Sequence, residues 1–441
     1  MTETAARTDA DGQIRGRIEE LMSAHDVPGA SIGALAHDAE HYWASGDRGG
    51  RHPGPIRPDT PFRAASLSKT VVATALMRLS EVDEVDLDRP VRAYLPDFAV
   101  RDPAATSAVT LHHLVTHRAG WSPNLDERRP PNECDAGALA RAVADLANAD
   151  QISPPGRFYS YSNTGFTVAG RIIEVITGMS FEDAADELVF RPAGMTDTHY
   201  PTDAAPPSGL AAGHTGNPAA MFEPWSRSRA RSPSGGLVTT AADLLLFARA
   251  LLDTTVIGRH TVTEMWRPRA EAVGFAERIA VGWNVDHLCD GTEYVGHAGN
   301  SDGYLAVLSV VPARRFAVAV LLNSTSFPPL AGIAQDLVTQ QFLGAARPEA
   351  ASVPFLPKPD VLPYLGDYTD GLANATVADA PDGVLLSSAP GLPTAPVLFT
   401  GPDEGVAHVG GADLVVRFLR DAGAVRWLRV SGLVFRRKDT T

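Results

Sequence analysis

Ser66 and Lys69 stand three residues apart in the segment Ser66-Leu67-Ser68-Lys69, directly after the strand-like residues 60–63. Positions i and i+3 of a helix share a face, so the spacing predicts that the lysine amine reaches the serine hydroxyl. A serine hydroxyl is a weak nucleophile until a base takes its proton, and a desolvated lysine can be that base. The pair predicts covalent acyl transfer through Ser66, although the same spacing also occurs on solvent-exposed helices.

Two further polar motifs follow along the chain. Tyr161-Ser162-Asn163 ends a loop-like run rich in proline and glycine, and it precedes an amphipathic helix expected over 166–176. His297-Ala298-Gly299 precedes the strand-like residues 304–311. A small residue and a glycine at a strand edge allow a substrate backbone to lie alongside. Taken singly, each motif also fits a packed tyrosine or a histidine that ends a turn.

In this order, the three motifs resemble the signature of the penicillin-recognising serine enzymes, which is S-x-x-K, then Y-x-N, then K-T-G or H-x-G. That superfamily contains penicillin-binding proteins, class C β-lactamases, esterases, D-aminopeptidases and the penicillin-binding-protein-type thioesterases that cyclise nonribosomal peptides. The resemblance covers residues 14–343 and includes the flanking segments 114–120, 191–195 and 234–244. It implies an α/β (α+β) fold in which helices flank an antiparallel sheet and a helical insertion separates its strands.

The resemblance also implies a role for each candidate residue. Ser66 would be the nucleophile, Lys69 the base that takes its proton, and Tyr161 the group that passes a proton to the leaving group. The other candidates would hold the substrate or the transition state: Asn163, Gly299, and the backbone N–H groups of Ser66 and Asn300 as an oxyanion hole. No cofactor and no metal are implied.

His297 departs from the lysine that is commoner at the third motif. A histidine with an unperturbed pKa near ~6.5 is mostly neutral at pH 7, so it offers no fixed charge to a substrate carboxylate. The H-x-G form is the one seen in the D-aminopeptidases, esterases and peptide-cyclising thioesterases of the superfamily. This makes a β-lactam or a D-Ala-D-Ala terminus a less natural ligand.

Composition excludes several classes of partner. The chain has 441 residues and a formal net charge of −14, which argues against nucleic acid or an anionic membrane as a partner. No apolar run of about 18 residues appears, so no membrane-spanning helix is expected. The polar segment 1–12 carries no export signal, and we therefore expect a cytoplasmic protein.

The order of elements predicts three regions. Residues 1–346 would form the catalytic domain, in which 29–37 and 39–44 pair with 304–311 and 316–323 while about 70–270 is mostly helical. Recurrent prolines predict a stiff linker over 347–363. Short strands separated by Gly and Asp turns predict a small antiparallel, lipocalin-like barrel over 364–441. Such a barrel either narrows the cleft or only adds stability.

Two other features have competing interpretations. His112, His113 and His117 include a pair at i, i+4 that suits zinc, but no third ligand stands nearby, and the segment resembles a structural T-H-x-x-G turn of the superfamily. Arg436 and Arg437 follow the last expected strand. They are either a solvated edge or a clamp for a substrate carboxylate.

Three functional hypotheses remain from the sequence. The favoured one is a stand-alone thioesterase that takes a peptide from a thioester, with a carrier protein as a further partner, and releases it as a head-to-tail macrocycle. The alternative is a hydrolase that acts on a small peptide or ester: a D-aminopeptidase, an esterase or a β-lactamase-like enzyme. A non-catalytic binding protein is the third, and the intact set of motifs argues against it.

Overall fold

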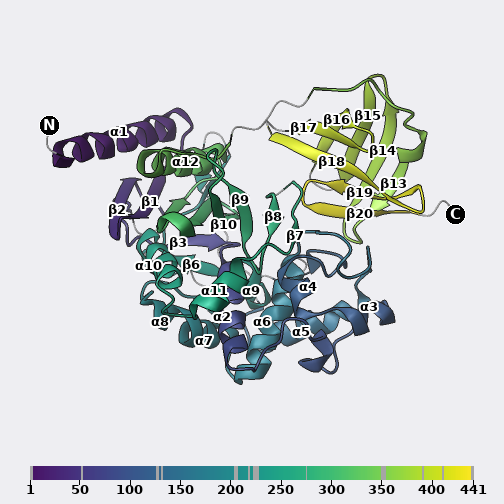
Figure 1. Ribbon diagram of the computed structural model, residues 1–441, viewed down its shortest axis with the longest axis horizontal. Helices are drawn as coiled ribbons and strands as arrows, with labels where there is room; N and C mark the ends of the chain where they lie inside the picture. Colours follow the sequence, from purple (N-terminus) through teal and green to yellow (C-terminus); the bar gives the residue numbers. More distant parts are fainter. Residues whose placement is uncertain are drawn as a thin grey trace.

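The computed structural model of the protein describes residues 3–50, 53–125, 129–130, 133–202, 207–216, 219–221, 228–274, 276–348, 354–389, 392–409 and 412–438. These residues form a large α/β part and a smaller C-terminal barrel (Figure 1). The fold class expected from the sequence is therefore confirmed.

The large part is built on an eight-stranded antiparallel sheet in the order β2-β1-β12-β11-β10-β9-β8-β7. Its strands are β1 (Gly29–Ala36), β2 (Ala39–Gly46), β7 (Ala270–Glu271), β8 (Arg278–Ile279), β9 (Asn284–His287), β10 (Glu293–Ser301), β11 (Tyr304–Val311) and β12 (Phe316–Leu322). Strand β1 pairs with β12 in the register Ala30↔Leu322, and β12 pairs with β11. The predicted pairing of the N-terminal hairpin with the late strands is confirmed.

Strand β12 shows why the middle of this sheet appears in the sequence as an unbroken apolar run. Successive side chains of a strand point to opposite faces. Ala319 and Leu321 lie in the core shared with helices α2 (Ser68–Glu81) and α10 (Ala241–Leu252), whereas Val318 and Val320 lie in the core shared with α1 (Glu3–Ala24) and α12 (Pro329–Leu343). Helices thus cover both faces of the sheet (Figure 1).

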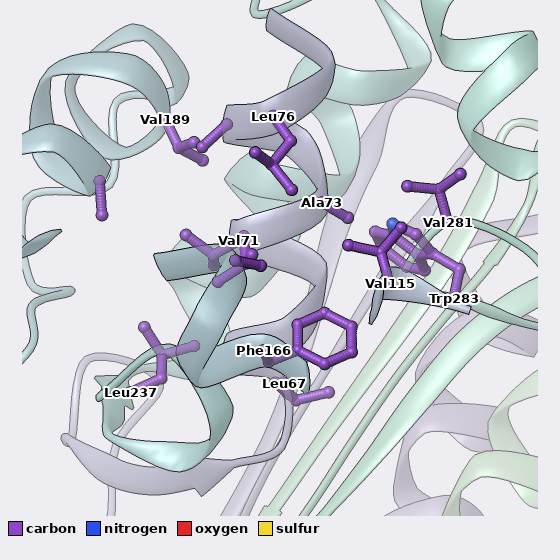
Figure 2. Close-up of a cluster of buried hydrophobic side chains, with 14 of the residues drawn as sticks. Leu67, Val71, Ala73, Leu76, Val115, Phe166, Val189, Leu237, Val281 and Trp283 are labelled. Carbon is purple, nitrogen blue, oxygen red and sulfur yellow. The ribbon is translucent and has the colours of Figure 1, made fainter. Parts of the chain in front are cut away.

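The segment between β2 and β7 is mostly helical and packs around α2. Helix α2 is buried along nearly its whole length, and Leu67, Val71 and Leu76 lie in one apolar cluster with Phe166 and Trp283 (Figure 2). A helix packed on all sides cannot shift without opening cavities in its surroundings. Any side chain that α2 directs toward a site is consequently held in place.

The remaining helices and strands of this part complete the large part of the fold. The helices are α3 (Pro103–Ala108), α4 (Leu111–Val115), α5 (Ala138–Ala144), α6 (Asn163–Thr177), α7 (Phe181–Ala185), α8 (Arg191–Ala193), α9 (Ser232–Gly235) and α11 (Arg259–Trp266). Single turns are η1 (Val91–Ala93), η3 (Asp145–Asn148), η4 (Asp186–Phe190), η5 (Arg229–Arg231) and η6 (Pro312–Arg314), and the two-stranded sheets are β3 (Phe62–Ala65) with β6 (Leu237–Thr239) and β4 (His214–Thr215) with β5 (Ala220–Met221). None of the described helices combines the length and the apolar character needed to cross a bilayer.

The C-terminal part is a closed barrel in which each strand pairs with its neighbour in sequence. The strands are β13 (Gly366–Thr369), β14 (Asn374–Ala380), β15 (Gly383–Ala389), β16 (Leu392–Gly401), β17 (Glu404–Val409), β18 (Ala412–Asp421), β19 (Ala424–Val430) and β20 (Leu433–Arg437). Pairing of Tyr368 with Arg437 closes the barrel. Strands β16 and β17 were not predicted, because Pro396 and Gly405 interrupt their patterns.

Side chains fill the inside of this barrel. Phe418 stacks on both Tyr364 and Phe399, with ring centroids 4.3 Å apart for Tyr364 and Phe418, and Tyr368 is fully buried in the same cluster. Residues 354–363 of the proline-rich linker run along the barrel, where Leu356 N–H donates to Phe399 O at 2.7 Å, and η7 (Leu362–Tyr364) leads into β13. Residues 354–363 of the linker therefore pack with the barrel, whereas Arg347 at its start pairs with Asp336 of α12.

Candidate active site

Ser66 lies on a sharp turn between a strand and a helix. Strand β3 ends at Ala65, whose φ of +46° is a left-handed conformation that residues with a Cβ rarely adopt. The spacing had predicted that Ser66 and Lys69 lie on the same helix. Helix α2 begins at Ser68, however, so Ser66 precedes it. The Lys69 N–H nevertheless donates to Ser66 O at 3.0 Å. This helix-like turn still places the hydroxyl and the amine together.

The Lys69 side chain is fully buried beside the serine. Its Nζ lies 3.1 Å from Ser66 Oγ, 2.8 Å from Asn163 Oδ1 and 2.6 Å from the main-chain carbonyl of Ser234. Three acceptors match the three N–H groups of an ammonium. The amine is thereby fixed against the hydroxyl. Ser234 of α9 belongs to the segment 234–244, which the sequence comparison with the superfamily included. No feature of that segment indicated that the Ser234 carbonyl would bind Lys69.

Tyr161 completes the group around Ser66. Its hydroxyl donates to Ser66 Oγ at 2.9 Å, and Lys69 Nζ lies 4.8 Å from the centre of its ring. The hydroxyl oxygen of Ser66 therefore contacts two groups that can move protons. The structure brings together four residues predicted from the sequence: Ser66, Lys69, Tyr161 and Asn163.

Ser162 explains how its two neighbours reach the same place. It is the N-cap of α6, and its Oγ accepts from Gly165 N–H at 3.1 Å and donates to Pro123 O at 3.0 Å. An N-cap fixes the point at which a loop becomes a helix. Tyr161 is consequently the last loop residue before the cap, and Asn163 is the first residue of the helix.

Strand β10 forms the wall beside the nucleophile. Strand β9 pairs with residues 293–296 of β10, so in the described chain the outer edge of 297–301 has no strand partner. A Cβ at Gly299 would lie 2.1 Å from Ala64 O and 3.3 Å from Ser66 N. Only glycine permits this approach. It brings the backbone of Gly299 and Asn300 to the turn that carries Ser66, where the oxyanion hole was expected.

His297 presents a neutral ring to this site. Its Nδ1 lies 2.7 Å from Ala298 O, and because a carbonyl only accepts, Nδ1 carries the proton and Nε2 the lone pair. Burial and the charge of Lys69 lower the pKa of His297 to about 3, well below the unperturbed value of ~6.5. Nε2 is buried and has no hydrogen-bond partner among the residues described. The third motif thus supplies an acceptor and no cation.

Folding should therefore become less favourable as the pH falls. The pKa of His297 is lower in the folded than in the unfolded state, so the unfolded state binds more protons below pH ~6.5 and the free energy of unfolding drops from there toward pH 3. We expect His297→Gln to reduce this slope by at most ~1.4 kcal/mol per pH unit. Urea unfolding between pH 7.5 and 4.5 measures it. The exposed His260→Gln is the control, and an unchanged slope in His297→Gln would contradict the prediction.

The histidines of the 112–117 segment have partners within the fold. His113 Nδ1 accepts from Thr110 N–H at 3.1 Å in the capping box of α4, and His117 Nδ1 accepts from Ser162 N–H at 2.9 Å. Within the described ranges, no three His, Cys, Asp or Glu residues are grouped so that they could hold a metal ion.

Residues 14–341 match the model of the family described as Beta-lactamase. The chain belongs to the beta-lactamase family. It is a serine hydrolase of the superfamily that contains the class C β-lactamases and penicillin-binding proteins, as the three motifs had implied. Penicillin-binding protein 4 of Amycolatopsis lactamdurans is 31% identical over 376 residues, which cover 80% of this chain and 96% of that protein.

Two other relatives of this beta-lactamase-family protein differ in how much of the chain they match. An unguisins hydrolase of Aspergillus campestris is 26% identical over 335 residues, covering 72% of this chain and 62% of that protein. The crystal structure of SurE is 26% identical and covers 98% of this chain and 100% of SurE, with a TM-score of 0.84. The likeness to SurE therefore includes the barrel, which the family match at 14–341 does not reach.

In this beta-lactamase-family protein the barrel packs on the loop that carries Tyr161. Gly432, in the turn between β19 and β20, accepts from Tyr161 N–H at 2.8 Å, and Trp427 Nε1 donates to Ile152 O at 2.8 Å. Ile152, Trp427 and Val434 form a buried apolar cluster between the two parts. Strands β19 and β20 are the barrel strands nearest to β7 and β8 (Figure 1). No feature of the sequence predicted this contact.

Arg436 and Arg437 have backbone partners. Arg436 Nη1 donates to Gln151 O at 3.1 Å, across the contact between the two parts. Arg437 Nη1 donates to Pro363 O at 2.8 Å and its Nη2 to Leu365 O at 2.6 Å, where the chain enters the barrel. The structure therefore places Arg436 beside the loop that leads to Tyr161 and Arg437 within the barrel. It shows no hydrogen bond from either arginine to Ser66, Lys69 or Tyr161.

Proposed function

We propose that this protein forms an acyl-enzyme at Ser66 and transfers the acyl group to an amine. The observation that carries the proposal is the position of Ser66 Oγ, 3.1 Å from Lys69 Nζ and 2.9 Å from the Tyr161 hydroxyl. A nucleophile needs a base within hydrogen-bond reach, and a leaving group needs a donor. Both groups lie within hydrogen-bond distance of Ser66 Oγ.

Acylation follows from these contacts. Lys69 in its neutral form takes the Oγ proton while Ser66 Oγ attacks the thioester carbonyl carbon. The backbone N–H groups of Ser66 and Asn300 stabilise the oxyanion, and one such donor is worth roughly 2.7–4 kcal/mol. As the C–S bond breaks, the thiolate takes a proton from the Tyr161 hydroxyl, which recovers one from Lys69. Asn163 keeps Lys69 in place and binds the substrate amide.

Release reverses these proton movements. The amine at the peptide's own N-terminus attacks the ester carbonyl and gives up a proton through Tyr161 to Lys69, and Ser66 Oγ regains a proton when the C–O bond breaks. The product is an amide that joins head to tail. Holding both ends together can supply an effective molarity of ~10⁵ M or more, which favours the amine over water.

The substrate that we propose is a peptide with a D-configured C-terminal residue, carried as a thioester, and two observations bear on the carboxyl end of that peptide. The neutral His297 offers Nε2 as an acceptor and leaves no cation for the carboxylate that a β-lactam or D-Ala-D-Ala substrate presents. A structure of SurE with D-Leu matches 98% of this chain with a TM-score of 0.81. The thioester would come from a carrier protein, which is the partner that we propose. The proposal includes neither nucleic acid nor a membrane as a partner.

A hydrolase is the second candidate, because one of the relatives above is named an unguisins hydrolase. The same acyl-enzyme would then be released to water, and the substrate would be a D-aminoacyl amide, a peptide or an ester. The two candidates share every step up to the acyl-enzyme. They differ in which nucleophile attacks the acyl-enzyme: the peptide's own amine in the first candidate and water in the second.

A peptidyl N-acetylcysteamine thioester with a D-configured C-terminal residue and a free amine tests the choice. We expect mainly the head-to-tail macrocycle and only minor linear acid, measured by liquid chromatography and mass spectrometry. The same peptide with an acetylated N-terminus cannot cyclise, so it should give linear acid or stall as an ester on Ser66. Linear acid alone from the free-amine peptide, together with rapid cleavage of a D-aminoacyl amide, would identify the hydrolase.

A further inference from the structure

Tyr161 lies in a segment that has no regular structure of its own. Between Gln151 and the start of α6 at Asn163, the described chain contains neither a helix nor a strand. The position of a loop side chain depends on what the loop packs against. Since the Tyr161 hydroxyl must lie within hydrogen-bond distance of Ser66, other parts of the molecule have to hold this loop.

Three successive backbone N–H groups around Tyr161 have partners on two sides. Ser160 N–H donates to His117 O at 2.8 Å and Ser162 N–H donates to His117 Nδ1 at 2.9 Å, whereas Tyr161 N–H donates to Gly432 O at 2.8 Å. Successive N–H groups of an extended chain point in opposite directions. Tyr161 is therefore held between His117 of the catalytic part and the barrel.

His117 also contacts the tyrosine ring directly. The two rings stack with centroids 4.4 Å apart and planes 27° apart, and His117 is only 1% exposed. Burial holds the pKa of His117 well below its usual value, so the ring stays neutral and Nδ1 keeps its lone pair. His117 adopts φ +57°, a left-handed conformation that few residue types tolerate. One residue thus fixes the backbone on both sides of Tyr161 and one face of its ring.

The barrel side of the contact is equally constrained. The turn Ser431-Gly432 joins β19 to β20, Ser431 N–H donates to Val415 O at 2.7 Å, and Val434 N–H donates to Ser160 Oγ at 3.2 Å. A Cβ at Gly274, between β7 and β8, would lie 2.5 Å from Ser431 Cα, so the turn is packed tightly against the catalytic part. The Gly432 carbonyl is held by its surroundings and is not a flexible contact.

We propose that His117 and the barrel turn Ser431-Gly432 form a two-sided clamp that positions the Tyr161 hydroxyl, which makes the barrel a positioning element for proton transfer. The proposal rests on the proposed function, in which Tyr161 gives the leaving group its proton. A misplacement of about 1 Å can cost roughly 10²-fold in rate. The barrel then matters for small substrates as well as for peptides, because the clamp acts on Tyr161 and not on the substrate.

Leaving groups of different basicity separate this role from general destabilisation. An ethyl ester requires a proton on the departing ethoxide, whereas p-nitrophenolate departs from the matching p-nitrophenyl ester without one. The quantity kcat/KM for both esters reports the steps up to the acyl-enzyme. Loosening the clamp should therefore slow the ethyl ester much more than the p-nitrophenyl ester, while a partly unfolded enzyme would lose both equally.

The test uses the full-length protein with two glycines inserted between Ser431 and Gly432. The control carries the same insertion between Pro381 and Asp382, both exposed in the β14–β15 turn, which lies at the opposite end of the barrel because the strands alternate in direction. A second variant, His117→Asn, tolerates the left-handed backbone but removes the stacked ring. Circular dichroism and melting curves verify that each protein is folded.

We expect the Ser431 insertion and His117→Asn each to lower kcat/KM for the ethyl ester at least about tenfold more than for the p-nitrophenyl ester. The control insertion should change the ratio of the two esters by less than about threefold. Equal losses on both esters, no loss in either folded variant, or the same effect from the control would overturn the clamp. If the unaltered enzyme is not acylated at Ser66 by the p-nitrophenyl ester, the proposed function itself fails, which is a distinct result.

Discussion

Replacing Ser66 with alanine should abolish turnover, with a loss on the order of 10⁴–10⁶ in kcat, and Lys69→Ala should come close to it. The two side chains act as one unit, because Lys69 Nζ lies 3.1 Å from the oxygen that it must deprotonate. The double variant should consequently be no worse than either single one. Their steady-state rates on the peptidyl thioester measure the effect.

A fluorophosphonate probe followed by mass spectrometry identifies the acylated residue. It should label Ser66 in the unaltered protein and in the control Ser107→Ala, which changes an exposed serine on α3, and it should label nothing in Ser66→Ala. Activity that persists in Ser66→Ala, or labelling of another serine, would refute the assigned nucleophile.

Replacing Tyr161 with phenylalanine should lower kcat by roughly 10²–10⁴ while the protein stays folded. The substitution removes only the hydroxyl that lies 2.9 Å from Ser66 Oγ and keeps the ring that stacks on His117. The free energy of unfolding should therefore change by no more than about 1.5 kcal/mol, the net value of one hydrogen bond. Rates on the thioester and urea unfolding measure the two quantities.

Tyr42→Phe is the matched control, since Tyr42 lies on β2, the edge strand farthest from β7, and donates to Glu40 at 2.7 Å. It should leave kcat unchanged. If Tyr161→Phe retained the full rate, Tyr161 would be a packing residue only, and the role of its hydroxyl as a proton donor would be lost.

The barrel acts on this site from outside. Tyr364, Tyr368, Phe399 and Phe418 are buried in the interior of the barrel. These described side chains occupy the space that a ligand would need. Its contacts with the catalytic part include the outer face of β19 and β20 and the turn between them. Gly371 of the β13–β14 turn also lies against Ser122, and Asp421 at the end of β18 pairs with Arg157. The sequence left open whether the barrel narrows the cleft or only adds stability. The contact with the Tyr161 loop points to a third role, which is to position Tyr161.

The catalytic residues and most elements around them could be predicted from the sequence, because their signals are local. Ser66 and Lys69 are three residues apart, and a single helical turn brings them together whatever surrounds it. Helix α10 (Ala241–Leu252) lies in the region that was predicted to be mostly helical, and β12 is a run of apolar residues that two covered faces explain. Such patterns depend on near neighbours in the chain.

The tertiary structure alone decided how these residues are held. The Ser234 carbonyl on Lys69, the Ala64 carbonyl that makes Gly299 obligatory, and the Gly432 carbonyl on Tyr161 are main-chain atoms, which look alike at every position of a sequence. The sequence also does not show how deeply a histidine is buried or which charges lie near it. The unperturbed pKa near ~6.5 already implied a mostly neutral His297, but its value of about 3 follows from burial beside Lys69.

His117 and the two arginines also have contacts that the sequence did not reveal. His117 stood in a segment that suggested a structural turn, and the fold places it against the proton-donating tyrosine. Arg436 and Arg437 were compatible with either a solvated edge or a clamp for a substrate carboxylate, and in the fold their guanidinium groups donate to backbone carbonyls. Which groups are adjacent depends on how distant segments pack, and burial then determines the charge and the partners of each side chain.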